Sequence, residues 1–95
     1  MSFSLRERIF MYKNKAANGL NNISGSRIKY FRTMLPGRVS QNDFAIMLQN
    51  NGLDLDKNAV QRIECGKRFV TDIELKVIAR VLNVSYQDLL DKDEG

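Results

Sequence analysis

Repeated helix start and stop signals divide most of this chain into short segments. Residues whose side chains can cap the first turn of a helix occur at Ser24 or Ser26, Ser40, Asp56, Thr71 and Ser85. Residues that end a helix follow at Pro36-Gly37, Asn50-Asn51-Gly52, Gly66 and Asn83. Apolar residues recur at helical spacing between these signals. The pattern therefore predicts an all-α fold built from five short helices.

The segment from Asp56 to Gly66 carries the strongest functional signal. Its apolar residues Ala59, Val60 and Ile63 fall on one side of a helix. The opposite side is polar and consists of Lys57, Asn58, Gln61 and Arg62. Such side chains offer the donors and acceptors that address base edges and phosphates in DNA. A helix this short is not stable alone, so we expect the rest of the chain to act as its scaffold.

Length and composition exclude several classes of function. The chain has 95 residues, enough for one small domain, and it contains no His and a single Cys, Cys65. An intramolecular disulfide is impossible, and no ligand set for a metal or nucleophile–base pair for an enzyme is visible. No apolar run approaches the ~20 residues that span a bilayer, and no signal peptide is recognisable. We therefore expect a cytoplasmic protein without catalytic activity, cofactor, metal or membrane partner.

The positive charge is concentrated in the first part of the chain. The net charge is +4, but residues 1–68 contain twelve Lys and Arg against five Asp and Glu, a balance of +7. The remaining residues contain three against six, a balance of −3. A basic region suits a polyanion, since each phosphate contact releases condensed counterions. A solvated cationic surface is the alternative, and charge by itself does not choose between the two.

We expect three regions along the chain. Residues 1–23 are an N-terminal extension, either a helix over about 5–17 with a flexible join after it or a flexible arm. Residues 24–91 form the compact domain, and residues 92–95 are a polar tail. Within the domain, Leu53 and Leu55 should pin one loop to the core. Phe69 and Val70 should anchor another, leaving Lys67 and Arg68 outside.

Over residues 25–90 the sequence resembles the lambda-repressor-like helix-turn-helix family, also called the XRE or Cro/repressor family. The resemblance is carried by four stretches, namely Arg27-Ile28 with Arg32, Ser40-Gln41 through Ala45, Val60 through Arg68, and Ile78 through Ser85 with Leu89-Leu90. It implies a five-helix domain in which the second and third helices form the helix-turn-helix unit. The connections at residues 34–39 and 50–55 are longer than is usual in the family. If the connection at 50–55 rotates the third helix, the base contacts shift by one or two positions.

The resemblance also implies roles for individual residues. Gln41 matches a position that touches the phosphate backbone and often a base, which suits an amide at a helix N-terminus. The expected positions facing base edges are Lys57, Asn58 and Arg62, with Gln61 as a further contact. Lys67 matches a loop position near phosphate, and Arg68 beside it is a further expected DNA contact. Arg32 and Glu64 match a buried or half-buried ion pair that joins the first helix to the end of the third.

These features predict a sequence-specific double-stranded DNA-binding transcriptional regulator, most simply a bacterial or phage repressor. One such domain contacts few base pairs, so we expect a homodimer on a pseudo-palindromic site. The dimer contact is expected either from Tyr86, Leu89 and Leu90 or from the leading segment. The alternative is a protein-interaction module of the same fold, an antitoxin or adaptor, whose partner is a toxin or co-regulator and whose DNA binding is secondary or lost.

Overall fold

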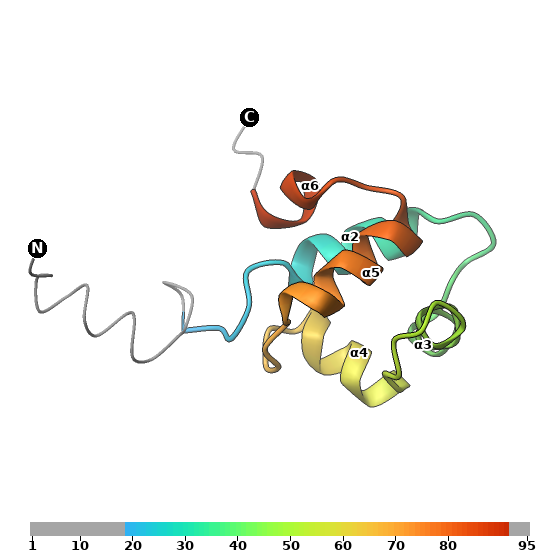
Figure 1. Ribbon diagram of the computed structural model, residues 1–95, viewed down its shortest axis with the longest axis horizontal. Coiled ribbons are helices and arrows are strands. Elements are labelled where there is room, and N and C mark those ends of the chain that lie inside the picture. Colours follow the sequence, from blue (N-terminus) through green and yellow to red (C-terminus); the bar gives the residue numbers. More distant parts are fainter. Residues whose placement is uncertain (1–18, 92–95) are drawn as a thin grey trace, which may run out of the picture.

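The protein is all-helical over residues 19–91, the part described by a computed structural model (Figure 1). Its helices are α2 (Gly25–Met34), α3 (Gln41–Asn50), α4 (Lys57–Glu64), α5 (Asp72–Leu82) and α6 (Tyr86–Leu90). The predicted all-α class is therefore confirmed for this part of the chain. The helix expected over residues 5–17 and the polar tail lie outside the described residues.

Four of the five predicted caps are present. Asp43 and Ser40 form a capping box at the start of α3, and Thr71 with Glu74 and Ser85 with Asp88 do the same for α5 and α6. At the start of α4, the carboxylate of Asp56 accepts a hydrogen bond from the backbone N–H of Ala59 at 2.8 Å. Each box satisfies backbone groups that have no partner inside the helix, so each helix begins where its cap stands.

The start of α2 differs from the prediction. Ser24 occupies the cap position, but its side chain makes no capping hydrogen bond. The Oδ1 atom of Asn22 accepts from the backbone N–H of Gly25 at 2.7 Å instead. An asparagine that we placed in a flexible join thus caps the first described helix, because its short amide reaches a free N–H three residues later.

One hydrophobic core joins all five helices. Its most deeply buried large side chains are Ile28 from α2, Phe44 and Leu48 from α3, Val60 and Ile63 from α4, Ile78 from α5 and Leu89 from α6. In Figure 1, α4 runs along one edge of the molecule with α3 beside it, and both α2 and α3 pack against α4. The core therefore supplies the scaffold that the eight-residue α4 requires.

The connection between α3 and α4 is pinned to the core, as predicted. Leu55 is buried and Leu53 packs against the core at its edge. Gly52 adopts a left-handed conformation with φ +86°, which lets the chain turn directly after α3. The side chain of Gln49 donates to the carbonyl oxygen of Leu55 at 2.9 Å. The approach to α4 is thus fixed by two apolar anchors and a side-chain hydrogen bond.

Two apolar residues lie elsewhere than expected. Phe69 is exposed and does not anchor the loop after α4, whereas Val70 does pack against the core. Val70 directly precedes the cap Thr71, a position that typically packs against the fourth residue of the helix, here the half-buried Leu75. At the other end, Leu89 is fully buried, so it cannot offer the dimer contact expected of it; Tyr86 and Leu90 remain exposed.

Candidate nucleic-acid interface

The helix α4 has one buried face and one exposed polar face. Its buried residues are Ala59, Val60, Ile63 and Glu64, and its exposed residues are Lys57, Asn58, Gln61 and Arg62. Positions one turn apart share a face of a helix, so the exposed side chains form one continuous surface. Within residues 19–91, none of these exposed side chains takes part in a hydrogen bond or ion pair. Their donors and acceptors are therefore available to a ligand.

Glu64 holds the back of α4 to two other elements. The guanidinium of Arg32 on α2 donates two hydrogen bonds to the carboxylate of Glu64, from Nε to Oε2 at 2.7 Å and from Nη2 to Oε1 at 3.0 Å. The third guanidinium nitrogen, Nη1, donates to the carbonyl oxygen of Val39 at 2.8 Å. Both charged residues are buried, so this is the internal ion pair that the resemblance implied. A bidentate pair is geometrically specific and fixes the separation of α2 and α4.

Gln41 joins the same network. Its Nε2 donates to Oε1 of Glu64 at 3.0 Å, and the residue is half-buried at the first position of α3. A side-chain amide carries two N–H bonds, and only one is used here. The second remains for a phosphate beside the start of α3, so the expected contact of Gln41 stays a prediction. The network also places Gln41 within a few ångströms of α4.

Lys67 and Arg68 have different environments. Lys67 is exposed, with its ammonium unpaired among residues 19–91. Arg68, which we expected to stay outside, folds back and forms a bidentate ion pair with Glu74 on α5, at 3.0 Å and 2.9 Å. The hydrogen bonds from Arg68 lower the pKa of Glu74, and those to Glu74 raise the pKa of Arg68. Lys67 therefore faces solvent, whereas the ion pair of Arg68 joins the loop after α4 to α5.

Asn21 and Asn22 are structural partners of α4 that sequence reasoning missed. Asn22 Nδ2 donates to the carbonyl oxygens of Ile63 at 3.0 Å and Arg68 at 2.8 Å. Asn21 donates through its backbone N–H to Gly66 and through its side chain to Lys67, both at 2.8 Å. From the sequence we placed both asparagines in the N-terminal extension. The spacing of Asn22 from Gly25 is also that of an asparagine cap, which was the available signal.

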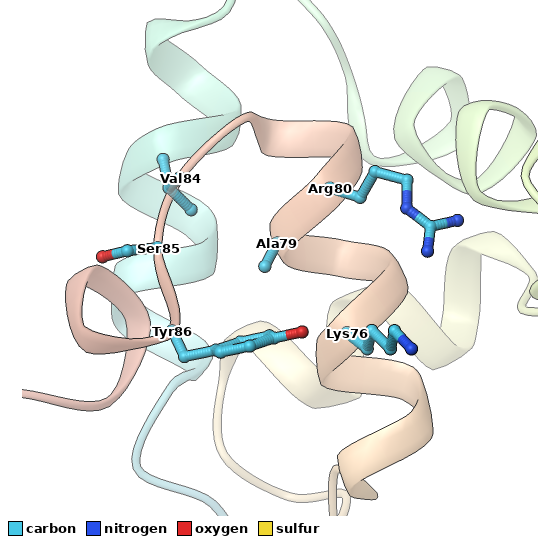
Figure 2. Close-up of a pocket in the computed structure, with 6 residues that line it drawn as sticks. All are labelled: Lys76, Ala79, Arg80, Val84, Ser85 and Tyr86. Atoms are coloured by element: carbon cyan, nitrogen blue, oxygen red, sulfur yellow. The ribbon is translucent and has the colours of Figure 1, made fainter.

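An open pocket of about 380 Å³ lies between α5 and α6. Figure 2 shows that Lys76 and Arg80 extend away from Val84 and Ser85, while the Tyr86 hydroxyl points toward Lys76. The hydroxyl oxygen of Ser85 accepts from the backbone N–H of Asp88 as part of the cap of α6. The polar groups of this pocket do not converge on one point, unlike those of a specific small-molecule site.

Residues 19–91 contain no cluster of three or more His, Cys, Asp or Glu side chains able to hold a metal ion. Over the same residues, no helix has the length and apolar character needed to cross a membrane. Comparisons with protein-family models, curated proteins and solved structures find no match for this chain. Function is therefore inferred from the geometry of α4 and its neighbours.

Proposed function

We propose that this protein is a sequence-specific, double-stranded DNA-binding transcriptional regulator of the helix-turn-helix type, and that it acts as a repressor. In this proposal α3, the connection after it and α4 form the helix-turn-helix unit, with α4 in the major groove. The observation that carries the proposal is the exposed face of α4. Four polar side chains there have no partner among the described residues, while the opposite face is held by the core and by Glu64.

The dimensions and chemistry of α4 support this reading. An α-helix with its side chains is roughly 10–12 Å in diameter, which the ~12 Å wide major groove admits, and the eight residues of α4 give a length of about 12 Å. Arg62 can bind guanine O6 and N7 with two N–H groups, and Asn58 can pair with adenine N6 and N7. Helices docked in this way present their N-terminal residues to base edges, which favours Lys57 and Asn58 as direct contacts.

Charges beside α4 suit the phosphate backbone. The balance of +7 through residue 68 includes Lys57, Arg62 and Lys67, all exposed and unpaired in the described structure. The unused N–H of Gln41 lies at the start of α3, where the same amide binds Glu64 of α4. Backbone contacts of this kind position the protein, whereas the α4 face supplies sequence discrimination.

A homodimer follows from the size of the proposed contact. One short helix reads only a few base pairs, so two copies on a pseudo-palindrome, with α4 helices ~34 Å apart, are needed for a unique site. Tyr86 and Leu90 remain exposed on α6 and are candidates for the contact between copies. Occupation of a promoter by such a dimer would repress transcription by excluding the polymerase.

Selection of bound sequences from random duplexes tests the proposal directly. We expect an enriched pseudo-palindrome with half-sites about one helical turn apart. Affinity for that site should then be measured for two double variants that each remove two exposed positive charges. Lys57→Ala/Arg62→Ala should lose most of the discrimination between the selected and a scrambled site, whereas Lys76→Ala/Arg80→Ala on α5 should retain it. Absence of duplex binding at low salt, with recovery of a stable protein partner, would favour the interaction module instead.

A further inference from the structure

The C-terminal end of α4 receives hydrogen bonds from a distant part of the chain. The last carbonyl groups of any helix have no partner within it and must find one elsewhere. Here the carbonyl oxygen of Ile63 accepts from Asn22 Nδ2 at 3.0 Å. The carbonyls of Gly66, Lys67 and Arg68 accept from Asn21 and Asn22 as well, at 2.8 Å each. We call Asn21, Asn22 and these four bonds the asparagine clamp.

Asn22 is the central residue of the asparagine clamp. Its side-chain amide makes three hydrogen bonds, because Nδ2 donates to two carbonyl oxygens of the clamp and Oδ1 accepts from the N–H of Gly25. One side chain thereby ties the start of α2 to the end of α4. Asn21 contributes less through its side chain, because its Oδ1 is buried without a hydrogen-bond partner in the described structure.

The two helices also meet without an intervening side chain. A Cβ atom added at Gly25 would overlap the carbonyl oxygen of Ile63 and crowd the Asn22 amide. Glycine at this position therefore lets the backbone of α2 approach the end of α4. The close approach and the asparagine clamp both involve the carbonyl oxygen of Ile63, the residue directly after the exposed Arg62.

We propose that Asn22 is a positioning residue for base recognition by α4, which rests on the DNA-binding function proposed above. A rotation of roughly 10° about the C-terminal end of a helix ~12 Å long would move its N-terminal end by about 2 Å. Hydrogen bonds to base edges require donor–acceptor distances near ~3 Å, so that displacement abolishes them. Phosphate contacts through long flexible side chains tolerate the same movement. Asn22 thus acts on sequence discrimination without touching DNA.

Two substitutions test this role. Asn22→Asp keeps the size of the side chain and the acceptor for Gly25, but replaces both donated bonds with a carboxylate facing two carbonyl oxygens. Asn22→Ala removes all three bonds and adds no charge. We expect each variant to lower the ratio of affinities for the selected and scrambled duplexes by about tenfold, the cost of roughly one mismatched base pair. Affinity of Asn22→Ala for the scrambled duplex should change by less than about threefold.

The ratio separates positioning from general loss of stability. A protein that is only destabilised has a smaller folded fraction. This lowers the apparent affinity for both duplexes by the same factor and leaves the ratio of the two affinities unchanged. Ser85→Ala, which removes a helix cap on α6, is the matched control and should keep the ratio of the parent chain. If the parent chain discriminates and both Asn22 variants do so equally well, the positioning role is wrong while the proposed function stands.

A second measurement does not depend on DNA. Residual dipolar couplings of the amide N–H bonds in α2 and α4 report the angle between these helices in solution. We expect this angle to differ from that of the parent chain in both Asn22 variants and to be unchanged in Ser85→Ala. An unaltered angle in both Asn22 variants overturns the inference whether or not the protein binds duplexes. If the parent chain shows no discrimination but the angle changes, the proposed function fails and the positioning of α4 by Asn22 stands.

Discussion

At the scale of single residues, Glu64 is the point where three helices meet. Its carboxylate accepts from Arg32 on α2 and from Gln41 on α3 while it ends α4. Each carboxylate oxygen is therefore hydrogen-bonded, and the buried negative charge faces a buried positive one. Burial of charges is tolerated under these conditions, whereas loss of one partner leaves the other uncompensated.

Breaking one half of this pair should strongly destabilise the fold. We expect Arg32→Met or Glu64→Gln to lower the free energy of unfolding by about 3–5 kcal/mol, measured by urea denaturation. The double variant should lose less than the sum of the two, because it leaves no unpaired buried charge. Arg62→Met, an exposed arginine on the same helix, should change stability by less than about 0.5 kcal/mol. Additive single effects would contradict a coupled buried pair.

Two exposed cations near the end of α4 should affect DNA binding in different ways. Arg62→Ala should weaken binding to the selected site by about 1–3 kcal/mol and relax the preference at one base pair, because it removes the proposed base contact. Lys67→Ala should weaken binding to all duplexes alike and reduce the slope of log affinity against log salt by about one unit, because it removes the proposed phosphate contact. Titrations of selected and scrambled duplexes over a salt series measure both quantities.

The opposite results would reassign these residues. Unchanged specificity in Arg62→Ala would mean that the contacts on α4 lie at other positions than those named here. Lys76→Ala on α5 is the matched control for loss of one exposed charge, and its salt slope should stay near that of the parent chain. A loss of specificity in Lys67→Ala would place that lysine at a base edge.

At the scale of elements, the start of α5 is stabilised by Glu74 in two ways. Its carboxylate accepts from the backbone N–H of Thr71 at 3.0 Å, which completes the capping box, and it forms the ion pair with Arg68. The bonds from Arg68 are the largest cause that lowers the pKa of Glu74 below its ordinary value of 4.5. One acidic side chain thus fixes both the first turn of α5 and the loop that follows α4.

This arrangement predicts how stability depends on pH. A lowered pKa means that the folded state binds a proton less readily than the unfolded state, so the contribution of Glu74 is full above the unfolded value and is lost as pH falls through the folded one. Glu74→Gln should therefore be less stable than the parent chain by about 1 kcal/mol at neutral pH. This difference in the free energy of unfolding should shrink between about pH 5 and pH 3, the range in which carboxyl groups ordinarily titrate. Urea denaturation at each pH measures it. Asp72→Asn, in the same turn, is the control. A difference that grew on acidification would contradict the sign.

At the scale of the whole molecule, the domain begins earlier than the sequence suggested. We placed residues up to 23 in an extension, but Asn21 and Asn22 are bonded to residues of α4 and of the loop after it. Leu20 also lies against Gly66, so that a Cβ at Gly66 would crowd its side chain. In Figure 1 this short segment runs beside the loop that joins α4 to α5. Residues 20–22 therefore belong structurally to the domain.

Two shortened chains test this boundary. A chain of residues 23–95 should be less stable than one of residues 19–95 by about 2 kcal/mol, because it lacks the asparagine clamp. Each hydrogen bond of the clamp contributes about 0.5–1.5 kcal/mol. Urea denaturation measures the difference, provided that the free energy of unfolding of both chains falls with urea concentration at the same slope. Asn22→Ala within the longer chain should reproduce a large part of it. Equal stability of the two chains would place the boundary where the sequence first indicated.

Much of the architecture was predictable because its signals are local. A capping residue such as Thr71 acts within one turn, and the apolar spacing of Ile78 and Leu82 indicates the face that packs inward. The division of α4 into buried and exposed faces was predictable for the same reason. Phe69 and Arg68 were misplaced because a loop has no repeating pattern that indicates where its side chains point. Arg68 pairs with Glu74, six residues later, and Phe69 is exposed.

By itself, the sequence determined where α3, α4, α5 and α6 begin and which side of α4 is polar, since both depend on residues within a turn of one another. The family resemblance added the pairing of Arg32 with Glu64, which spacing alone does not contain. Only the tertiary structure decided that Asn22 binds the end of α4, more than forty residues away, because that contact exists only once α2 has packed against α4. The caps form between residues that are close in sequence, whereas the contacts that position α4 form between residues that become neighbours only on folding.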